Sequence, residues 1–182
     1  MRASPLNFLI VKLNATGDVV RTTTLLHRLQ GNITWVTAPN NVVLLDGLLN
    51  SVRCLSWQDR ALAFDREYDL VISLEDEVDT AQFLNGVRHK QVFGAYLNGE
   101  EEVKYTDDAR RSFDLSLISV DGRQRADELK YLNRHSYQEL VFEGLGFRFE
   151  GERYGLPTPP ETDLSGDVAI APVAGPVWPM KN

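Results

Sequence analysis

The sequence predicts an α/β protein with an open, parallel β-sheet and helices on both faces. Short, β-branched apolar segments recur along the first half of the chain, and each is followed by a segment of helical or loop character. Continuous apolar strands of this kind are typical of parallel sheets that are covered on both faces. The strong preference for right-handed crossovers then favours an open, twisted sheet.

The first half of the chain alternates between expected strands and helices. The strands are predicted at residues 9–13, 32–37, 52–55, 68–74 and 90–95. The helices are predicted at residues 22–30, after Pro39, around residues 58–64 and through residues 80–84.

The second half is organised differently. Residues 96–121 contain an Asn-Gly turn signal and a run of three glutamates, which indicate a long excursion on the ligand side of the sheet. Helices are expected at residues 125–133 and 136–145. A proline-rich segment then indicates a linker. We therefore expect an N-terminal domain over residues 1–155, a linker over 156–166, and the first strand and loop of an incomplete second domain over 167–182.

Composition narrows the class of protein. The 182 residues are 43% hydrophobic and 25% charged, as in ordinary globular domains, and the net charge of −7 argues against nucleic-acid binding. The single cysteine, Cys54, excludes an intrachain disulfide and a cysteine-based zinc cluster, and we expect it to be buried and inert. The N-terminal apolar run is interrupted by Lys12 and makes a poor signal peptide. No transmembrane segment and a cytoplasmic location are expected.

The turn at residues 14–18 separates the first strand from the first helix, where ligands bind in open α/β sheets. Its single glycine does not match the dinucleotide-binding fingerprint. Asp18 either caps the helix or acts as a general base. Taken alone, capping is the commoner role of such an aspartate, although Asn14 and Thr16 could also cap, which weakens that interpretation. Lys12, a charge at the end of an otherwise buried strand, requires a partner.

Residues 9–23 resemble the opening of the heptosyltransferases, which form glycosyltransferase family nine: a strand with a lysine near its end, a polar Gly-Asp-Val turn and a threonine-containing helix start. Residues 33–36, 68–72 and 89–94 resemble later strands of that family. Near the end, residues 168–172 and 178–182 resemble the first strand and the donor loop of the family's second domain.

The resemblance implies the N-terminal half of a GT-B architecture, in which two Rossmann-like domains face each other. This half receives the acceptor, and the other binds a nucleotide-diphosphate sugar, usually ADP-heptose. Transfer is expected to be inverting and to need neither a metal nor another cofactor. A missing domain or a separate protein partner must supply the donor site, so we expect the chain alone to be inactive.

The resemblance also assigns roles to individual residues. Asp18 matches the base that deprotonates the acceptor hydroxyl. Lys181 would offset the charge that builds on the leaving group, with Thr16 and Gly17 also on the donor side. Lys12 would support the turn.

Four residues are expected to contact the acceptor: Asn14, Arg21, Asp79 and His135. Arg21 stands where the family commonly has histidine, and His135 is either a loosely shared family residue or an ordinary histidine. The acidic run at residues 75–79 is either a solvated helix start or a sign of an acceptor that is not anionic and carries amines.

Two other classes of protein stay open at this point. The chain could be a binding or scaffold domain that kept the fold without catalysis, or a stand-alone flavodoxin-like domain for a small ligand.

Overall fold

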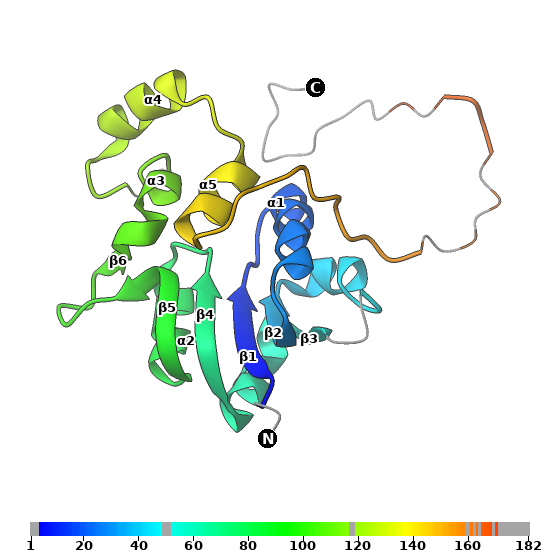
Figure 1. The fold of residues 1–182 in the computed structure, drawn as a ribbon, viewed down its shortest axis with the longest axis horizontal. Coiled ribbons are helices and arrows are strands. Elements are labelled where there is room, and N and C mark those ends of the chain that lie inside the picture. The colour runs from blue at the N-terminus through cyan, green and yellow to red at the C-terminus, as the bar shows by residue number, and fades with distance from the viewer. Residues whose placement is uncertain are drawn as a thin grey trace.

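The computed structural model describes residues 4–48, 52–116, 119–158, 161, 163, 165–168 and 170. In this part of the chain a six-stranded sheet has the order β3-β2-β1-β4-β5-β6 (Figure 1). The strands are β1 (Leu6–Val11), β2 (Gly31–Thr37), β3 (Val52–Ser56), β4 (Glu67–Ser73), β5 (Arg88–Leu97) and β6 (Val103–Tyr105). Neighbours from β3 to β5 are parallel, which confirms the predicted fold class. The antiparallel strand β6 was not predicted.

Several helices differ from the expected ones in their bounds or in their type. The helices are α1 (Thr16–Thr22), η1 (Thr23–His27), η2 (Pro39–Leu44), η3 (Trp57–Asp65), α2 (Val78–Asn85), η4 (Asp107–Ala109), α3 (Arg110–Phe113), α4 (Arg123–Leu132) and α5 (Tyr137–Gly144), where η denotes a 3₁₀-helix. The first helix begins at Thr16 rather than at residue 22, and the segments after β2 and β3 are 3₁₀-helical.

Three consecutive threonines explain why the first helix changes type. The hydroxyls of Thr22, Thr23 and Thr24 donate to backbone carbonyls three or four residues earlier, over 2.6–2.8 Å. Threonine is stiff at its branched Cβ, and such hydroxyl bonds compete with the regular helical pattern. The chain therefore passes from α1 into η1 at this point.

Alternate strand residues point to opposite faces of the sheet and form two buried clusters. One cluster includes Ile10, Trp35 and Ile72 and is covered by α1, η1 and α5. The other includes Leu9, Val36 and Val71 and is covered by η3 and α2. In Figure 1, α1 and α5 lie in front of the sheet and α2 lies behind it. The prediction of helices on both faces is confirmed.

In the second half of the chain, the Asn-Gly turn and the helix expected near residues 136–145 are confirmed as well. The backbone N–H of Asn98 donates to the carbonyl of Glu102 over 2.9 Å, which closes the β5–β6 hairpin at the expected turn. Helix α5 begins with a capping box: the Ser136 side chain accepts from the Glu139 backbone, and the Glu139 side chain accepts from the Ser136 backbone. This box fixes the start of α5 and so the position of Tyr137.

The chain after α5 returns across the first face of the sheet. Arg28 of the α1–β2 connection pairs with Glu150 and Glu152, and the Gly155 N–H donates to the Thr23 hydroxyl over 2.9 Å. The expected strand after the linker falls mostly on residues outside the described ranges, as does Lys181; Val168 and Ile170 are exposed. The domain boundaries therefore stay predictions.

Candidate functional site

The centre of the sheet is the place where the strand order changes direction. The chain builds β2 and β3 on one side of β1, then crosses to place β4 and β5 on the other. A crevice for ligands opens at such a switch point, beyond the carboxyl ends of the strands. Lys12 directly follows β1 and Glu75 follows β4, so both lie at this point.

Lys12 and Glu75 form a buried ion pair. The Lys12 Nζ lies 2.9 Å from the Glu75 Oε1, and the side chains are only 9% and 8% exposed. The Lys12 ammonium also donates to the Leu74 carbonyl over 3.2 Å. The expectation that Lys12 has a partner is confirmed, although the sequence did not identify that partner.

Glu75 also holds the turn in place. Its Oε1 accepts the backbone N–H groups of Leu13 and Asn14 over 2.6 and 2.8 Å. The solvated-helix interpretation of the acidic run is wrong for Glu75, because α2 begins only at Val78 and Glu75 is 6% exposed. Because Glu75 is paired with Lys12, it is also not a free carboxylate that could bind an amine of the acceptor.

The far side of the turn is held by Asn41, which the sequence did not single out. This fully buried amide accepts from the Thr16 hydroxyl over 2.8 Å and donates to the Leu13 carbonyl over 2.7 Å. The Asn14–Ala15 peptide bond between these contacts is cis. A Cβ at Gly17 would meet nothing within 4 Å, so the space in front of the turn is open.

Asp18 does not cap α1. The N-cap is Ala15, which has no side-chain cap, and Asp18 lies within the first turn of the helix. Its Oδ1 accepts a hydrogen bond from the Arg21 guanidinium over 3.0 Å, and the Asp18 side chain is 35% exposed. The carboxylate is thus oriented by its neighbour and still reaches solvent. Arg21 orients Asp18 with one of its N–H groups, and its side chain is 52% exposed.

A cavity of about 360 Å³ lies in front of this turn. Besides Lys12, Asp18, Glu75 and Asp76, it is lined by Leu74, Ser112, Phe113, Leu115, Ser116, Asn133, His135, Tyr137 and Leu140. The structure therefore brings Asp18 and His135 together, as the sequence predicted for base and acceptor contact. Asp79 does not belong to this cavity, because it lies on α2 beside η3 and lines a separate groove on the other face of the sheet. That part of the expected acceptor site is corrected.

Tyr137 adds a hydroxyl at a position that the sequence indicates only as part of an apolar helix face. Its oxygen lies 3.0 Å from the Thr22 hydroxyl. Burial raises the pKa of Tyr137, the hydrogen bond with Thr22 lowers it, and the charges of Asp18 and Glu75 raise it further. Tyr137 therefore stays a neutral hydroxyl beside Asp18.

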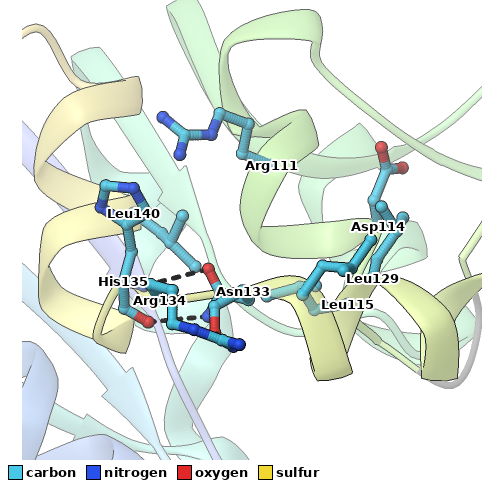
Figure 2. A pocket seen from close by; sticks show the side chains of 9 residues that line it. Arg111, Asp114, Leu115, Leu129, Asn133, Arg134, His135 and Leu140 are labelled. Atoms are coloured by element: carbon cyan, nitrogen blue, oxygen red, sulfur yellow. Dashed lines mark hydrogen bonds between the residues drawn. The ribbon is translucent and has the colours of Figure 1, made fainter.

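A second cavity of about 390 Å³ adjoins the first between α3, α4 and α5. The two share Leu115, Asn133, His135 and Leu140. Figure 2 shows two hydrogen bonds between the Asn133 side chain and the His135 backbone. The Asn133 amide donates to the His135 carbonyl over 2.7 Å, and the His135 N–H donates to the Asn133 Oδ1 over 3.2 Å. These bonds hold the wall that the two cavities share.

Arginine and leucine side chains line this second cavity together with Asp114. Arg111 pairs with Glu143, whereas the Arg134 guanidinium donates to the backbone carbonyls of Tyr131 and Asn133. Arg134 has no carboxylate partner in the described ranges. The second cavity thus combines the Arg134 guanidinium with the Asp114 carboxylate and several leucine side chains, whereas the first is lined by Asp18, Glu75 and Asp76.

Within the residues that the structure describes, no group of three or more histidine, cysteine, aspartate or glutamate side chains is arranged to hold a metal ion. Among these same residues, no helix combines the length and apolar character needed to cross a membrane.

No protein-family model and no curated protein matches the chain. Among solved structures, it is similar to E. coli heptosyltransferase WaaC with ADP, at 16% identity and a TM-score of 0.48, over 82% of this chain and 50% of that one. It is also similar to a glycosyl transferase family 9 protein from Veillonella parvula, at 16% identity and a TM-score of 0.44, over 75% of this chain and 44% of that one. The chain spans about half the length of these proteins. The likeness concerns the fold alone.

Proposed function

We propose that this chain is the acceptor-binding half of an inverting, metal-independent glycosyltransferase that uses a nucleotide-diphosphate sugar similar to ADP-heptose. The observation that carries the proposal is the position of Asp18. Its carboxylate lines a cavity at the switch point of the sheet, on a turn fixed by the Lys12–Glu75 pair.

The proposed reaction requires one proton acceptor on the acceptor side of the site, which this chain would form. The acceptor hydroxyl attacks the anomeric carbon, the bond to the diphosphate breaks, and the hydroxyl proton passes to Asp18. A single displacement of this kind inverts the anomeric centre. Arg21 holds the Asp18 Oδ1, and Oδ2 has no protein partner within the described ranges, so it is available to accept the proton.

The joined cavities supply room for the acceptor beyond its reacting hydroxyl. His135 and Asn133 belong to both cavities and would contact the middle of the acceptor. The Arg134 guanidinium, which has no carboxylate partner among the described residues, would bind a negatively charged or polar substituent of the acceptor in the second cavity.

The donor side is proposed to come from elsewhere. Thr16 and Gly17 border the open space in front of the turn, and Lys181 would offset the charge on the leaving diphosphate. A donor domain, either in further sequence or in a separate polypeptide, would complete the site. Cytoplasmic location also remains part of the proposal, since a nucleotide sugar must be present.

Reconstitution tests this function. The chain is combined with its encoded neighbour or co-purifying protein, and release of nucleoside diphosphate from the sugar donor is measured with candidate acceptors. We expect release by the pair and by neither component alone, and loss of release with Asp18→Ala. Transfer that survives Asp18→Ala would show that Asp18 is not the base. A pair that binds a saccharide acceptor without releasing nucleotide would instead indicate a scaffold domain.

A further inference from the structure

A groove on the opposite face of the sheet plays no part in the proposed transfer. It runs between η3 and α2 and has a volume of about 610 Å³, within the usual range of ligand sites. Figure 1 shows α2 behind the sheet, away from α1 and α5. The η3–α2 groove is lined by Gln58, Arg60, Ala61, Phe64, Asp79, Gln82, Phe83 and Gly86.

The floor of the groove is aromatic and held in position. The Phe64 ring lies against Phe83 with 5.4 Å between centroids and a tilt of 30°. A Cβ at Gly86 would come within 3.0 Å of the Phe64 ring, so the glycine allows the ring to lie close to the end of α2. Phe64 nevertheless remains 40% exposed. An aromatic surface is thus fixed in place and open to solvent.

The rim of the groove supplies both donors and acceptors of hydrogen bonds. The Arg60 guanidinium lies 4.2 Å from the centre of the Trp57 ring and donates to the Trp57 carbonyl, which orients its remaining N–H groups. Gln58 accepts from the Ser56 hydroxyl, which leaves its amide N–H₂ group free to donate.

Two further polar side chains on α2 complete the rim. Asp79 and Gln82 make no side-chain hydrogen bond or ion pair within the part of the chain that the structure describes, and both are exposed. Asp79 can accept from two hydroxyls, whereas Gln82 can both donate and accept. The α2 side of the rim therefore offers hydrogen-bonding capacity that no group in the described part of the chain uses.

We propose that the η3–α2 groove binds a neutral saccharide unit. The C–H face of a pyranose is apolar and packs on an aromatic ring, while its hydroxyls each donate and accept, which matches the floor and the rim. A phosphate fits poorly because the carboxylate of Asp79, on α2 across the groove from Arg60, would repel a second negative charge. A purely apolar ligand would desolvate Asp79 and Gln82 without replacing their hydrogen bonds with water.

Binding of simple glycosides tests the site without reference to transfer. Methyl glycosides of glucose, galactose, mannose and N-acetylglucosamine are added at millimolar concentration, and saturation-transfer NMR and calorimetric titration report binding. We expect binding of at least one glycoside, with transfer concentrated on the ring C–H protons of one face. Phe64→Ala and Gln82→Ala should each weaken the affinity by about tenfold.

Matched variants distinguish binding in the groove from binding elsewhere on the protein. Leu62→Ala removes an exposed apolar side chain of the same helix that does not line the groove, and Asp18→Asn alters the other cavity; both should bind as the wild type does. Far-ultraviolet circular dichroism checks that each variant is folded. If Phe64→Ala does not fold, Gln82→Ala is used as the groove variant on its own. Absence of binding by every glycoside, unchanged affinity in the folded groove variants, or equal weakening by Leu62→Ala overturns the proposal. A loss with Asp18→Asn alone also overturns it, because the sugar would then lie in the other cavity.

Discussion

Substitution of Lys12 by methionine tests the buried ion pair that holds the turn. The change keeps an unbranched side chain of similar length but leaves the Glu75 carboxylate, which is 8% exposed, without its counter-charge. Breaking a buried pair in this way costs about 3–5 kcal/mol. Glu75 keeps two backbone N–H donors, at 2.6 and 2.8 Å, so we expect the lower end, about 3 kcal/mol of the free energy of unfolding.

The assay is a double-mutant cycle in urea. Unfolding is followed by tryptophan fluorescence, to which the fully buried Trp35 contributes directly beside the pair, since its indole N–H lies 3.4 Å from the Lys12 carbonyl. Glu75→Gln alone leaves the Lys12 ammonium buried without a carboxylate and is also destabilising. The loss of unfolding free energy in the double variant should be smaller than the sum of the two single losses by about 1–3 kcal/mol.

A surface pair provides the matched control. Lys90 and Asp69 lie 2.7 Å apart, but the Lys90 side chain is 62% exposed, so Lys90→Met should leave the unfolding midpoint nearly unchanged. A cost of Lys12→Met no greater than that of Lys90→Met, or simple additivity of the two single changes, would show that the buried pair does not stabilise the fold.

Three further predictions concern other features of the fold. Burial raises the pKa of the Cys54 thiol to about 11 from its usual 9.0, so alkylation by iodoacetamide at pH 8 should be about a hundredfold slower than for an exposed thiol. Because the unfolded thiol releases its proton first, stability should fall as pH rises from about 9 to 11; an unchanged stability over this window contradicts the assignment. Gly94→Ala should cost about 3 kcal/mol or more in urea unfolding, because φ is 107° and the new Cβ would lie 1.9 Å from a β4 carbonyl oxygen, whereas Gly99→Ala should be nearly neutral. Ser136→Ala should cost about 1 kcal/mol by loss of the α5 cap, and an unchanged thermal midpoint would count against the capping box.

The strands were predictable because their chemistry is local. β1, β2 and β4 each have a central apolar or β-branched segment that is covered on both faces, and their positions follow from the sequence without knowledge of their neighbours. Helix type was less predictable. Apolar spacing does not distinguish a short α-helix from a 3₁₀-helix, and the competing threonine hydroxyls at the end of α1 became evident only in the folded chain.

The candidate site was predictable in part for a related reason. Asp18 lies in a turn whose sequence is distinctive, so it was identified from local residues. Glu75 was missed because its role depends on Lys12, which is far away in the sequence, and on the adjacency of β1 and β4. The adjacency of β1 and β4 at the switch point of the sheet is the signal that could have predicted the pairing of Lys12 with Glu75. Asp79 was misplaced because the acidic run is continuous in sequence, although the chain turns into α2 between Glu75 and Asp79.

The most direct test of the proposed function compares two acids in one cavity. Asp18 and Asp76 both line the 360 Å³ cavity, but only Asp18 is assigned as the base. In the chain reconstituted with the proposed donor domain, Asp18→Asn should lower kcat for nucleotide release by about 10²–10⁴ with acceptor binding retained, while Asp76→Asn should change kcat little. Equal kcat values for wild type and Asp18→Asn, or a larger loss with Asp76→Asn, would contradict the assignment of Asp18 as the base.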